Sequence, residues 1–503
     1  MLHYLKLACN KKIVFWIALA LFSIFLACLS TNYDYDLFAR LIVGERFVEQ
    51  GILPFKDFLS YTPTHPWYDH EWGSGVIFYL ILKHFKAGGL LFLHAIMLFS
   101  TSIFIIKTQR LKKHAYPTSL LFMWIFLMFY MRLNPSIIRC QFFSFLFFSI
   151  FLYILEATRI KKSTKLIWLL PLITIIWNNL HGGVVSGLGL IGIYFIGAIL
   201  EKKQWKTYLI VLFLSTGMLI INPYGVNYLE FLFSATTKTR TYITEWWPFY
   251  ARRHITYYTP SVIYGLFGIF ATIKQTMDTK KNDYTKFIIL ISTLYLGAAH
   301  VKLLSLTIIT VAALCYNDIV YLLRHFKKFF CKIEKCIYPA IFVLSLLIPL
   351  FSPLVPRCDF TTFPLYEIEF LKINNIKGNI VTPFGLGSYT TYKLYPDNLV
   401  YMDGRYEEVY DDYIFNTLKD FELVNKNWKD ILTKYPTDIL MPIKNNKIYN
   451  TLKNDKDWVL IFDGRLCGIF VKKENVKFSY LEPEYKIDYY RKTIFKHGEF
   501  KND

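Results

Sequence analysis

The run IVFWIALALFSIFLACLS, from Ile13 to Ser30, carries no charged side chain and follows two lysines, Lys11 and Lys12. As a helix it is long enough to cross the hydrocarbon core of a bilayer, and several other runs of about 15 to 20 residues are almost as free of charge. Of the 503 residues, 54% are hydrophobic and 18% are aromatic, which leaves too little polar surface for a soluble protein of this length. The sequence therefore predicts a multi-pass α-helical membrane protein. The length of the first run favours a retained helix over a cleaved signal peptide.

The distribution of positive charge predicts how the chain threads the membrane. A net charge of +20 would point to nucleic acid in a soluble protein, but here the bases crowd into short segments between apolar runs. Four of these segments read KTQRLKKH, ATRIKKSTK, EKKQWK and IKQTMDTKKNDYTK, and basic loops of this kind lie on the cytoplasmic side. With the N-terminus inside, about eleven spans bring every basic loop to that side, and the last span, about 337–354, exits to the outside. We expect an integral protein of the bacterial inner membrane with no nucleic-acid partner.

From about residue 360 the chain becomes mixed and polar. The runs GNIVTPF, NLVYMDGR, TDILMPI and WVLIFDGRLCGIFVKK are typical of strands, and helical patterns lie between them. The last run is split at Asp463–Arg465, which predicts a β-hairpin. We expect a transmembrane domain over residues 1–355 with its first outer loop at 31–72, a C-terminal extracytoplasmic α/β domain over 356–473, and a charged tail over 474–503.

Ionisable and amide side chains gather at the predicted outer ends of the spans. The first outer loop alone holds seven acids against three bases between Thr31 and Trp72. Charged groups near hydrocarbon are costly unless they are paired or face water, so a set contributed by many helices indicates a cavity that opens outward. Each member taken singly has an ordinary explanation as a solvated, capping or snorkelling side chain. The set is Asp34, Asp36, Asp57, His70, Glu71, Arg132, Asn134, Arg139, Asn178, Asn179, His181, Asn222, Glu245, His300 and Lys302.

Two carboxylates at positions i and i+2, Asp34 and Asp36, can serve as a general base, as metal ligands, or as both. Nearby arginine, lysine and histidine side chains suit an anionic group such as a phosphate, and this combination beside lipid fits transfer from a lipid-phosphate donor. No serine–histidine nucleophile signature, P-loop or Rossmann glycine pattern is present, and the eight cysteines form no CxxC pair. The other acids of the loop, Glu45, Glu49 and Asp69, need no special role.

Two longer motifs follow the acid pair: G-x(6)-G-x-x-P-x-x-D-x-x-S-Y-T, which begins at Gly44, and W-x-x-H-E-W, which begins at Trp67. This arrangement resembles the GT-C superfamily of membrane glycosyltransferases, and it looks closest to bacterial members related to the protein O-mannosyltransferase and lipid A aminoarabinose transferase group. RCQFFSF, WNNLHGG, INPYG, ITEWWP and YPDNLVYMDGR are also similar to a large group of bacterial membrane proteins with this layout. The resemblance covers most of the chain and is more specific for the superfamily than for the substrate.

The resemblance implies a polyprenyl-phosphate sugar donor, an extracytoplasmic acceptor (lipid, glycan or protein) and inversion at the anomeric carbon. It also implies that an acid of the first outer loop is the catalytic base or binds a metal, Mg²⁺ or Mn²⁺, beside the acceptor. Asp34 and Asp36 match that position, and Asp36 is favoured as the base. Asp57 or Glu71 matches the second acid of some members. The candidates for contacts with substrate or donor phosphate are Arg139, His181, Lys302, Asp57, His70, Glu71 and Glu245.

One departure from the resemblance and two rival functions bear on this expectation. The WWD signature of oligosaccharyltransferases is absent, because Trp246 and Trp247 are followed by Pro248, so transfer of a whole glycan to asparagine is disfavoured. A transporter or flippase of a lipid-linked intermediate would also use an outward cavity, but the sequence has no internal repeat and no acid in the middle of a span. A non-catalytic envelope assembly protein is the other alternative, because the DGR sequences at 403–405 and 463–465 are typical of turns.

Overall fold

The computed structural model describes most of the chain, and its contacts divide the protein into two compact units. We name residues 1–30, 91–135 and 140–354 the helical unit, and residues 31–90, 136–139 and 355–503 the mixed unit. The last predicted span lies almost entirely outside the described residues, as does the chain beyond residue 483. The described residues are 11–29, 33–112, 119–134, 138–238, 240–326, 361–477 and 479–483, with isolated positions between 328 and 347.

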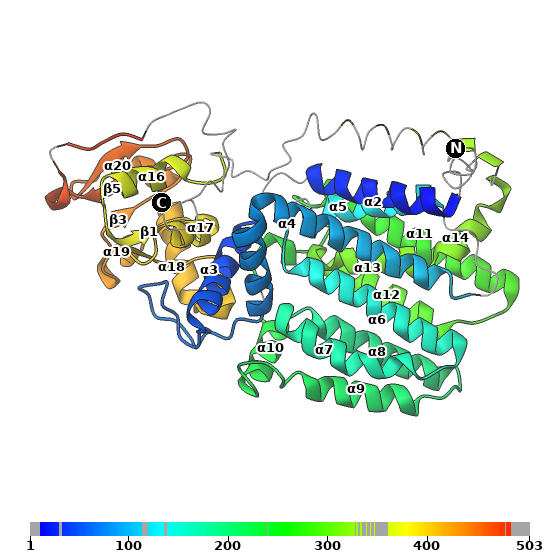
Figure 1. Cartoon of the computed structure of the whole chain (residues 1–503). Coiled ribbons are helices and arrows are strands. Elements are labelled where there is room, and N and C mark those ends of the chain that lie inside the picture. The colour runs from blue at the N-terminus through cyan, green and yellow to red at the C-terminus, as the bar shows by residue number, and fades with distance from the viewer. Residues whose placement is uncertain are drawn as a thin grey trace. The chain divides into compact units, whose positions relative to one another are not determined.

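Apolar helices make up the helical unit (Figure 1). Among the described residues, α4 (Trp72–Gln109), whose first part belongs to the mixed unit, and α6 (Gln141–Lys161) are long and apolar enough to cross a membrane. A pair bent by 64° is a third candidate: Val301–Leu314, which contains α13 (Leu304–Leu314), with α14 (Tyr316–Leu322). The count of about eleven spans therefore stays a prediction. The unit also contains α2 (Lys11–Leu29), α5 (Leu120–Leu133), α7 (Leu169–Leu180), α8 (Val184–Leu200), α9 (Lys206–Met218), α10 (Asn227–Thr237), α11 (Ile255–Thr279) and α12 (Tyr284–Ala299).

The helices α7, α8 and α9 lie side by side in the helical unit (Figure 1). Large apolar side chains point away from this layer: Leu172 on α7 is 57% exposed and Phe213 on α9 is 78% exposed. Apolar side chains this exposed on adjoining helices would promote aggregation in water, whereas lipid covers them in a membrane. The helical unit therefore has the surface of an integral membrane protein.

The sequence predicts a loop over 31–72, but the structure has a helix there, α3 (Tyr35–Gln50). Asp34 is its N-cap, and the Asp34 carboxylate accepts the backbone N–H of Asp36 at 3.0 Å. Gly51 ends the helix in the left-handed conformation at φ 70°, as expected of a C-cap glycine. The acids of this stretch suggest a loop because they are scattered among apolar residues, and only the fold shows that the first half of the helix, Leu37–Gly44, is buried on all sides.

A glycine contact brings α3 close to α4 within the mixed unit. A Cβ atom at Gly44 would lie 2.1 Å from the carbonyl oxygen of Gly75, which no side chain could tolerate. The two glycines of the first motif, Gly44 and Gly51, are thus explained by helix packing and by helix termination.

A five-stranded sheet forms the centre of the C-terminal part of the mixed unit. Its strand order is β2-β1-β3-β5-β4, with β1 parallel to both β2 and β3, and with β5 antiparallel to β3 and β4. The pairing of β4 with β5 confirms the hairpin predicted around Asp463–Arg465. The elements are α16 (Leu365–Ile373), β1 (Gly378–Val381), α17 (Phe384–Leu394), β2 (Asn398–Val400), α18 (Asp412–Leu423), α19 (Asp430–Lys434), β3 (Ile439–Leu440), α20 (Lys447–Lys453), β4 (Trp458–Asp463) and β5 (Gly468–Lys472).

Aromatic packing joins α3 to this C-terminal part. The ring of Phe38, which is fully buried, lies 4.9 Å from the ring of Tyr389 and 5.7 Å from that of Tyr392, both on α17. The ring of Phe363 also packs against that of Phe38, at 5.5 Å. Because buried aromatic rings contribute much of the energy of a core, α3 is anchored on α17, and residues 31–90 belong to the same compact unit as the sheet.

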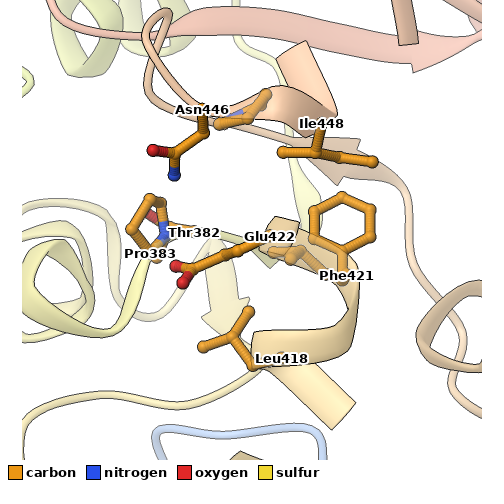
Figure 2. Close-up of a pocket in the computed structure, with 9 residues that line it drawn as sticks. Thr382, Pro383, Leu418, Phe421, Glu422, Asn446 and Ile448 are labelled. Carbon is orange, nitrogen blue, oxygen red and sulfur yellow. The ribbon is translucent and has the colours of Figure 1, made fainter. Parts of the chain in front are cut away.

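A hollow lies at the carboxyl ends of β1 and β3 (Figure 2). In parallel sheets, ligands bind at such points, where the chain leaves neighbouring strands in opposite directions. Thr382, Glu422 and Asn446 contribute polar groups to the hollow, but it has no space for a water molecule. The hollow is therefore too tight to admit a ligand in this structure.

Candidate functional site

The acid pair predicted from the sequence lies at the N-terminus of α3 and is joined by Arg139. The Nε atom of Arg139 lies 3.1 Å from Oδ2 of Asp34, and its second guanidinium nitrogen lies 3.1 Å from Oδ2 of Asp36. Residues 136–139 belong to the mixed unit, so these ion pairs form within one compact body. The helix N-terminus adds partial positive charge from its free N–H groups, which attracts negative charge to this place.

The two acids differ in access to solvent. The side chain of Asp34 is 13% exposed and is occupied by the cap and by Arg139, whereas that of Asp36 is 48% exposed. Both carboxylates share one cation, but only Asp36 presents a large open surface to an incoming molecule. Asp34 is therefore the more enclosed of the two acids, and Asp36 is the more accessible.

A second cluster surrounds Arg40, one turn further along α3. Arg40 is 3% exposed and its guanidinium contacts three carboxylates. They belong to Asp69, to Glu71 at 3.0 Å and to Glu408 at 2.7 Å. His70 completes the cluster, with Nε2 3.6 Å from Glu71 and Nδ1 3.4 Å from Glu408. One guanidinium faces three carboxylates, two of them buried, and the excess negative charge favours a bound proton or a bound cation.

Protonation of this cluster centres on Glu408. Burial raises the pKa of Glu408 to about 7, although Arg40 and His70 oppose the shift. Asp69, His70 and Glu408 each present one ligand atom, and the three atoms lie within 4.8 Å of one another. Two carboxylate oxygens and an imidazole nitrogen suit a divalent cation such as Mn²⁺ better than Mg²⁺, which prefers oxygen ligands alone. The donor set fits a cation at a different place from Asp34 and Asp36.

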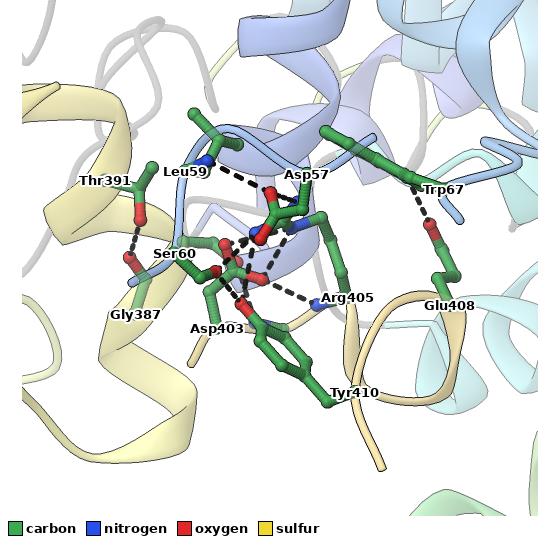
Figure 3. Close-up of polar contacts among 12 residues, drawn as sticks. Asp57, Leu59, Ser60, Trp67, Gly387, Thr391, Asp403, Arg405, Glu408 and Tyr410 are labelled. Atoms are coloured by element: carbon green, nitrogen blue, oxygen red, sulfur yellow. Dashed lines mark hydrogen bonds and ion pairs between the residues drawn. The ribbon is translucent and has the colours of Figure 1, made fainter. Parts of the chain in front are cut away.

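A third cluster is built on Arg405 of the first DGR sequence (Figure 3). Its Nε atom lies 2.8 Å from Oδ1 of Asp403, and a terminal nitrogen lies 2.5 Å from Oδ1 of Asp57. The other terminal nitrogen donates to Ser60 at 3.1 Å and to the Tyr410 hydroxyl at 3.0 Å. The side chains of Arg405, Asp57 and Asp403 are at most 1% exposed. This sealed network connects the motif after α3 to the segment after β2.

Trp67 links the Arg405 cluster to the Arg40 cluster. Its ring lies 4.3 Å from the guanidinium carbon of Arg405, and its indole N–H donates to Oε2 of Glu408 at 3.3 Å (Figure 3). Burial alone would raise the pKa of Asp57, but the positive charge of Arg405 outweighs it and the pKa lies below the ordinary value. Asp57 is therefore an ionised structural partner of Arg405 in this structure.

The remaining sequence candidates lie in the helical unit. His181 ends α7, and its Nδ1 accepts the backbone N–H of Gly183 at 2.9 Å and the hydroxyl of Ser144 at 2.7 Å. Trp177 in turn donates to Ser144 at 2.7 Å. The imidazole is thus fixed by a chain of hydrogen bonds where α7 meets the next helix.

Lys302 and Glu245 lie near Trp246. The Lys302 ammonium is 5.6 Å from the ring centroid of Trp246, and the guanidinium of Arg240 is 4.2 Å from it. Glu245 precedes this tryptophan in a short 3₁₀ helix, and His300 binds the carbonyl of Trp246 at 2.7 Å. The sequence candidates are therefore divided: six lie in the mixed unit, and His181, Glu245 and Lys302 lie in the helical unit.

The structure also adds residues that the sequence does not single out. Sequence patterns assign no role to Asp69, which is fully buried, and read the DGR at 403–405 as a turn. No local sequence pattern marks Arg40 or Glu408 as functional. Arg40 lies on a helix that the sequence predicts to be a loop, and Glu408 lies more than 300 residues further along the chain. The one available clue was the charged Asp-Gly-Arg that directly follows the apolar run NLVYM.

The fold and these clusters define a membrane protein with an apolar helical unit and a mixed unit rich in buried carboxylate–arginine pairs. No family model and no curated protein matches the chain. Among solved structures, the chain is similar to the archaeal oligosaccharyltransferase AglB from Archaeoglobus fulgidus, in complex with an inhibitory peptide and a dolichol-phosphate. The TM-score is 0.58 and the identity 8%, over 86% of this chain and 70% of that chain. At this identity the likeness concerns the fold alone.

Proposed function

We propose that the protein is an inverting glycosyltransferase that moves a sugar from a polyprenyl-phosphate donor to an extracytoplasmic lipid, glycan or protein. The observation that carries this proposal is the pairing of Asp34 and Asp36 with Arg139 at the N-terminus of α3, with Asp36 left half exposed. The fold likeness to an oligosaccharyltransferase supports the same reaction class. The proposal includes an inner-membrane protein with a cytoplasmic N-terminus and an extracytoplasmic mixed unit.

In this reaction Asp36 is the general base. An acceptor O–H or N–H attacks the anomeric carbon of the sugar, and the bond from that carbon to the phosphate oxygen breaks. The phosphate leaves with the electron pair, and Asp36 takes the proton of the acceptor. Arg139 and the cap made by Asp34 hold the Asp36 carboxylate in place, so that no energy is spent on orienting it during the reaction.

The leaving phosphate needs positive charge. Arg139, His181 and Lys302 remain the sequence-based candidates for this role, and Asp57, His70, Glu71 and Glu245 remain candidates for substrate contacts. A divalent cation held by Asp69, His70 and Glu408 would supply charge that stabilises a phosphate leaving group. Asp57 contributes by fixing the loop through Arg405, and Glu71 contributes by holding Arg40.

Transfer of labelled sugar tests the proposal. The purified protein in bilayers is supplied with a panel of radiolabelled polyprenyl-phosphate sugars and with membranes from a strain that lacks the gene, which provide the acceptors. We expect label to appear in one acceptor fraction, with Asp36→Asn reducing the rate about 100-fold or more. Asp457→Asn is the matched control, because Asp457 is an exposed acid of the same unit outside the clusters.

Three outcomes would overturn the assignment. Full activity in both Asp36→Asn and Asp34→Asn would remove the acid pair from the chemistry. Movement of an intact donor across the bilayer without sugar transfer would instead indicate the transporter or flippase. An absence of both activities, with the mixed unit still binding an envelope component, would indicate the assembly protein.

A further inference from the structure

The helical unit contains a cavity of about 320 Å³ that uses no residue of the mixed unit. Its walls come from four places: the segment after α4, the end of α6, the segment between α8 and α9, and the junction of α11 with α12. These are the same four basic segments that the charge pattern places on the cytoplasmic side. Loops that are separated by up to about 170 residues in sequence therefore meet around one space.

The cavity lining is strongly cationic. Among the described residues, five bases and one acid, Asp283, line it. The bases are Lys112, Arg159, Lys203, Lys281 and Lys286. A cavity of this volume is within the usual range for a small-molecule site, and basic pockets between membrane helices bind phosphate headgroups.

Two of the five bases are neutralised inside the protein and make up the rigid part of the wall. Arg159 binds Asp283 through two nitrogens, at 2.8 and 3.1 Å, and binds Glu156 in the same two-pronged way at 3.0 and 3.1 Å. Lys286, only 3% exposed, is paired with Asp318. These buried pairs hold the ends of α6 and α12 in place, and they leave little charge for a ligand.

Of the other three bases, Lys203 and Lys281 are exposed and Lys112 is partly buried. In the described part of the chain, Lys112 and Lys281 form no ion pair. Lys203 is paired with Glu201, but its side chain is 56% exposed and can turn toward a ligand. Three ammonium groups on three different loops therefore face one space that also has uncharged donors, among them the hydroxyl of Thr276. Lysines arranged in this way suit the diffuse charge of a phosphate.

We propose that this cavity binds a small anion with one or two phosphate groups, on the side of the membrane predicted to be cytoplasmic. The same chemistry is offered by the headgroup of a lipid phosphate and by free inorganic pyrophosphate. The site is independent of the acid pair on α3, because the two share no residue.

Binding of inorganic pyrophosphate and of polyprenyl phosphate tests the proposal in two arms. In the first arm, pyrophosphate is titrated calorimetrically into the full-length protein in phosphatidylcholine nanodiscs. In the second, native mass spectrometry counts polyprenyl phosphate bound to the protein in the same lipid. The test variant is Lys112→Gln/Lys203→Gln/Lys281→Gln. The control variant, Lys162→Gln/Lys202→Gln/Lys280→Gln, removes the same charge from exposed lysines of the neighbouring loops that do not line the cavity.

We expect the test variant to lose at least tenfold in affinity for one or both probes, and the control variant to lose less than threefold. Binding of pyrophosphate identifies a soluble ligand class, and binding of polyprenyl phosphate alone identifies a lipid headgroup. Equal losses in the two variants would overturn the proposal, because general surface charge would then explain binding. Failure of the unsubstituted protein to bind either probe at low ionic strength would overturn it as well.

Discussion

Arg139 and Arg405 each hold two aspartates in the mixed unit, yet their surroundings are opposite. The Arg405 group is sealed, with side chains at most 1% exposed, and joins the motif after α3 to the segment after β2. The Arg139 group is open on one side, because Asp36 is 48% exposed. A sealed ion pair contributes to the architecture and cannot meet a ligand. An open pair on a helix N-terminus adds little stability but can take a proton or contact a substrate.

The largest effect is expected at Arg405. Arg405→Leu leaves Asp57 and Asp403 buried without their cation, and removal of one partner from a buried ion pair costs about 3–5 kcal/mol. The mixed unit should lose that much free energy of unfolding, measured by thermal unfolding and by limited proteolysis in detergent.

The second DGR sequence supplies the matched control for this experiment. Arg465 is the arginine of the second DGR, and its side chain is exposed. Arg465→Leu should therefore lower the free energy of unfolding by less than about 1 kcal/mol. Equal destabilisation by the two substitutions would show that the first DGR is only a turn, as the sequence pattern suggested.

At Arg139 the expected loss is in activity. Arg139→Gln leaves Asp34 and Asp36 side by side without a shared cation, which disturbs the position of the proposed base. We expect sugar transfer to fall about 10- to 100-fold, while the free energy of unfolding falls by less than about 1 kcal/mol, because the pair is partly exposed.

Arg139→Lys refines this test, since lysine keeps the charge but lacks the planar fork that contacts two carboxylates at once. Its transfer rate should lie between those of the parent and of Arg139→Gln. A loss of stability as large as that of Arg405→Leu would remove the contrast between the open and the sealed group.

The sequence predicted the open group better than the sealed one. Asp34, Asp36 and Arg139 stand at the predicted outer ends of apolar runs, and apolar runs are a strong signal because a bilayer demands them. That signal brings residues about 100 positions apart to the same side of the membrane. It does not show which of them pair, and whether they are catalytic remains a prediction.

The sealed groups depend on contacts that no local pattern encodes. Arg405 meets Asp57 across 348 positions, and Arg40 meets Glu408 across 368. The hairpin of β4 and β5 and the strand-like runs were predictable, because alternation and turn residues are local. The packing of α3 on α17 was not, since Phe38 and Tyr389 look like ordinary apolar residues until the two segments meet.

An intermediate effect is expected at Glu408, whose cluster lies between the open and the sealed extremes. Its pKa is raised by burial to about 7, above the ordinary value of 4.5, so the folded state binds a proton that the unfolded chain releases. The contribution of this proton to the free energy of unfolding is fully present below about pH 4.5 and is lost as the pH rises through 7. Between pH 4.5 and 7 the loss is up to about 1.4 kcal/mol per pH unit.

Glu408→Gln, which stays neutral, should remove that dependence. Melting curves recorded from pH 5 to 8 should show a decline for the parent and a flatter profile for the variant. With added Mn²⁺, the melting temperature of the parent should instead rise with pH, because the cation needs the ionised carboxylate and binds more tightly as the pH rises. A parent profile as flat as that of the variant would place the proton elsewhere in the cluster.

The smallest effect is expected at Asp34, and it decides between the two acids of the open group. Asn caps a helix about as well as Asp, so Asp34→Asn should keep the hydrogen bond to the N–H of Asp36 and change the free energy of unfolding by less than about 1 kcal/mol. Asp34→Ala loses the cap as well and should cost about 1 kcal/mol more, measured by thermal unfolding. Because Asp34 is only 13% exposed, transfer by Asp34→Asn should fall much less than transfer by Asp36→Asn. A stable Asp34→Asn protein that is as inactive as Asp36→Asn would make Asp34 the base, and solvent exposure would then be the wrong criterion for choosing between them.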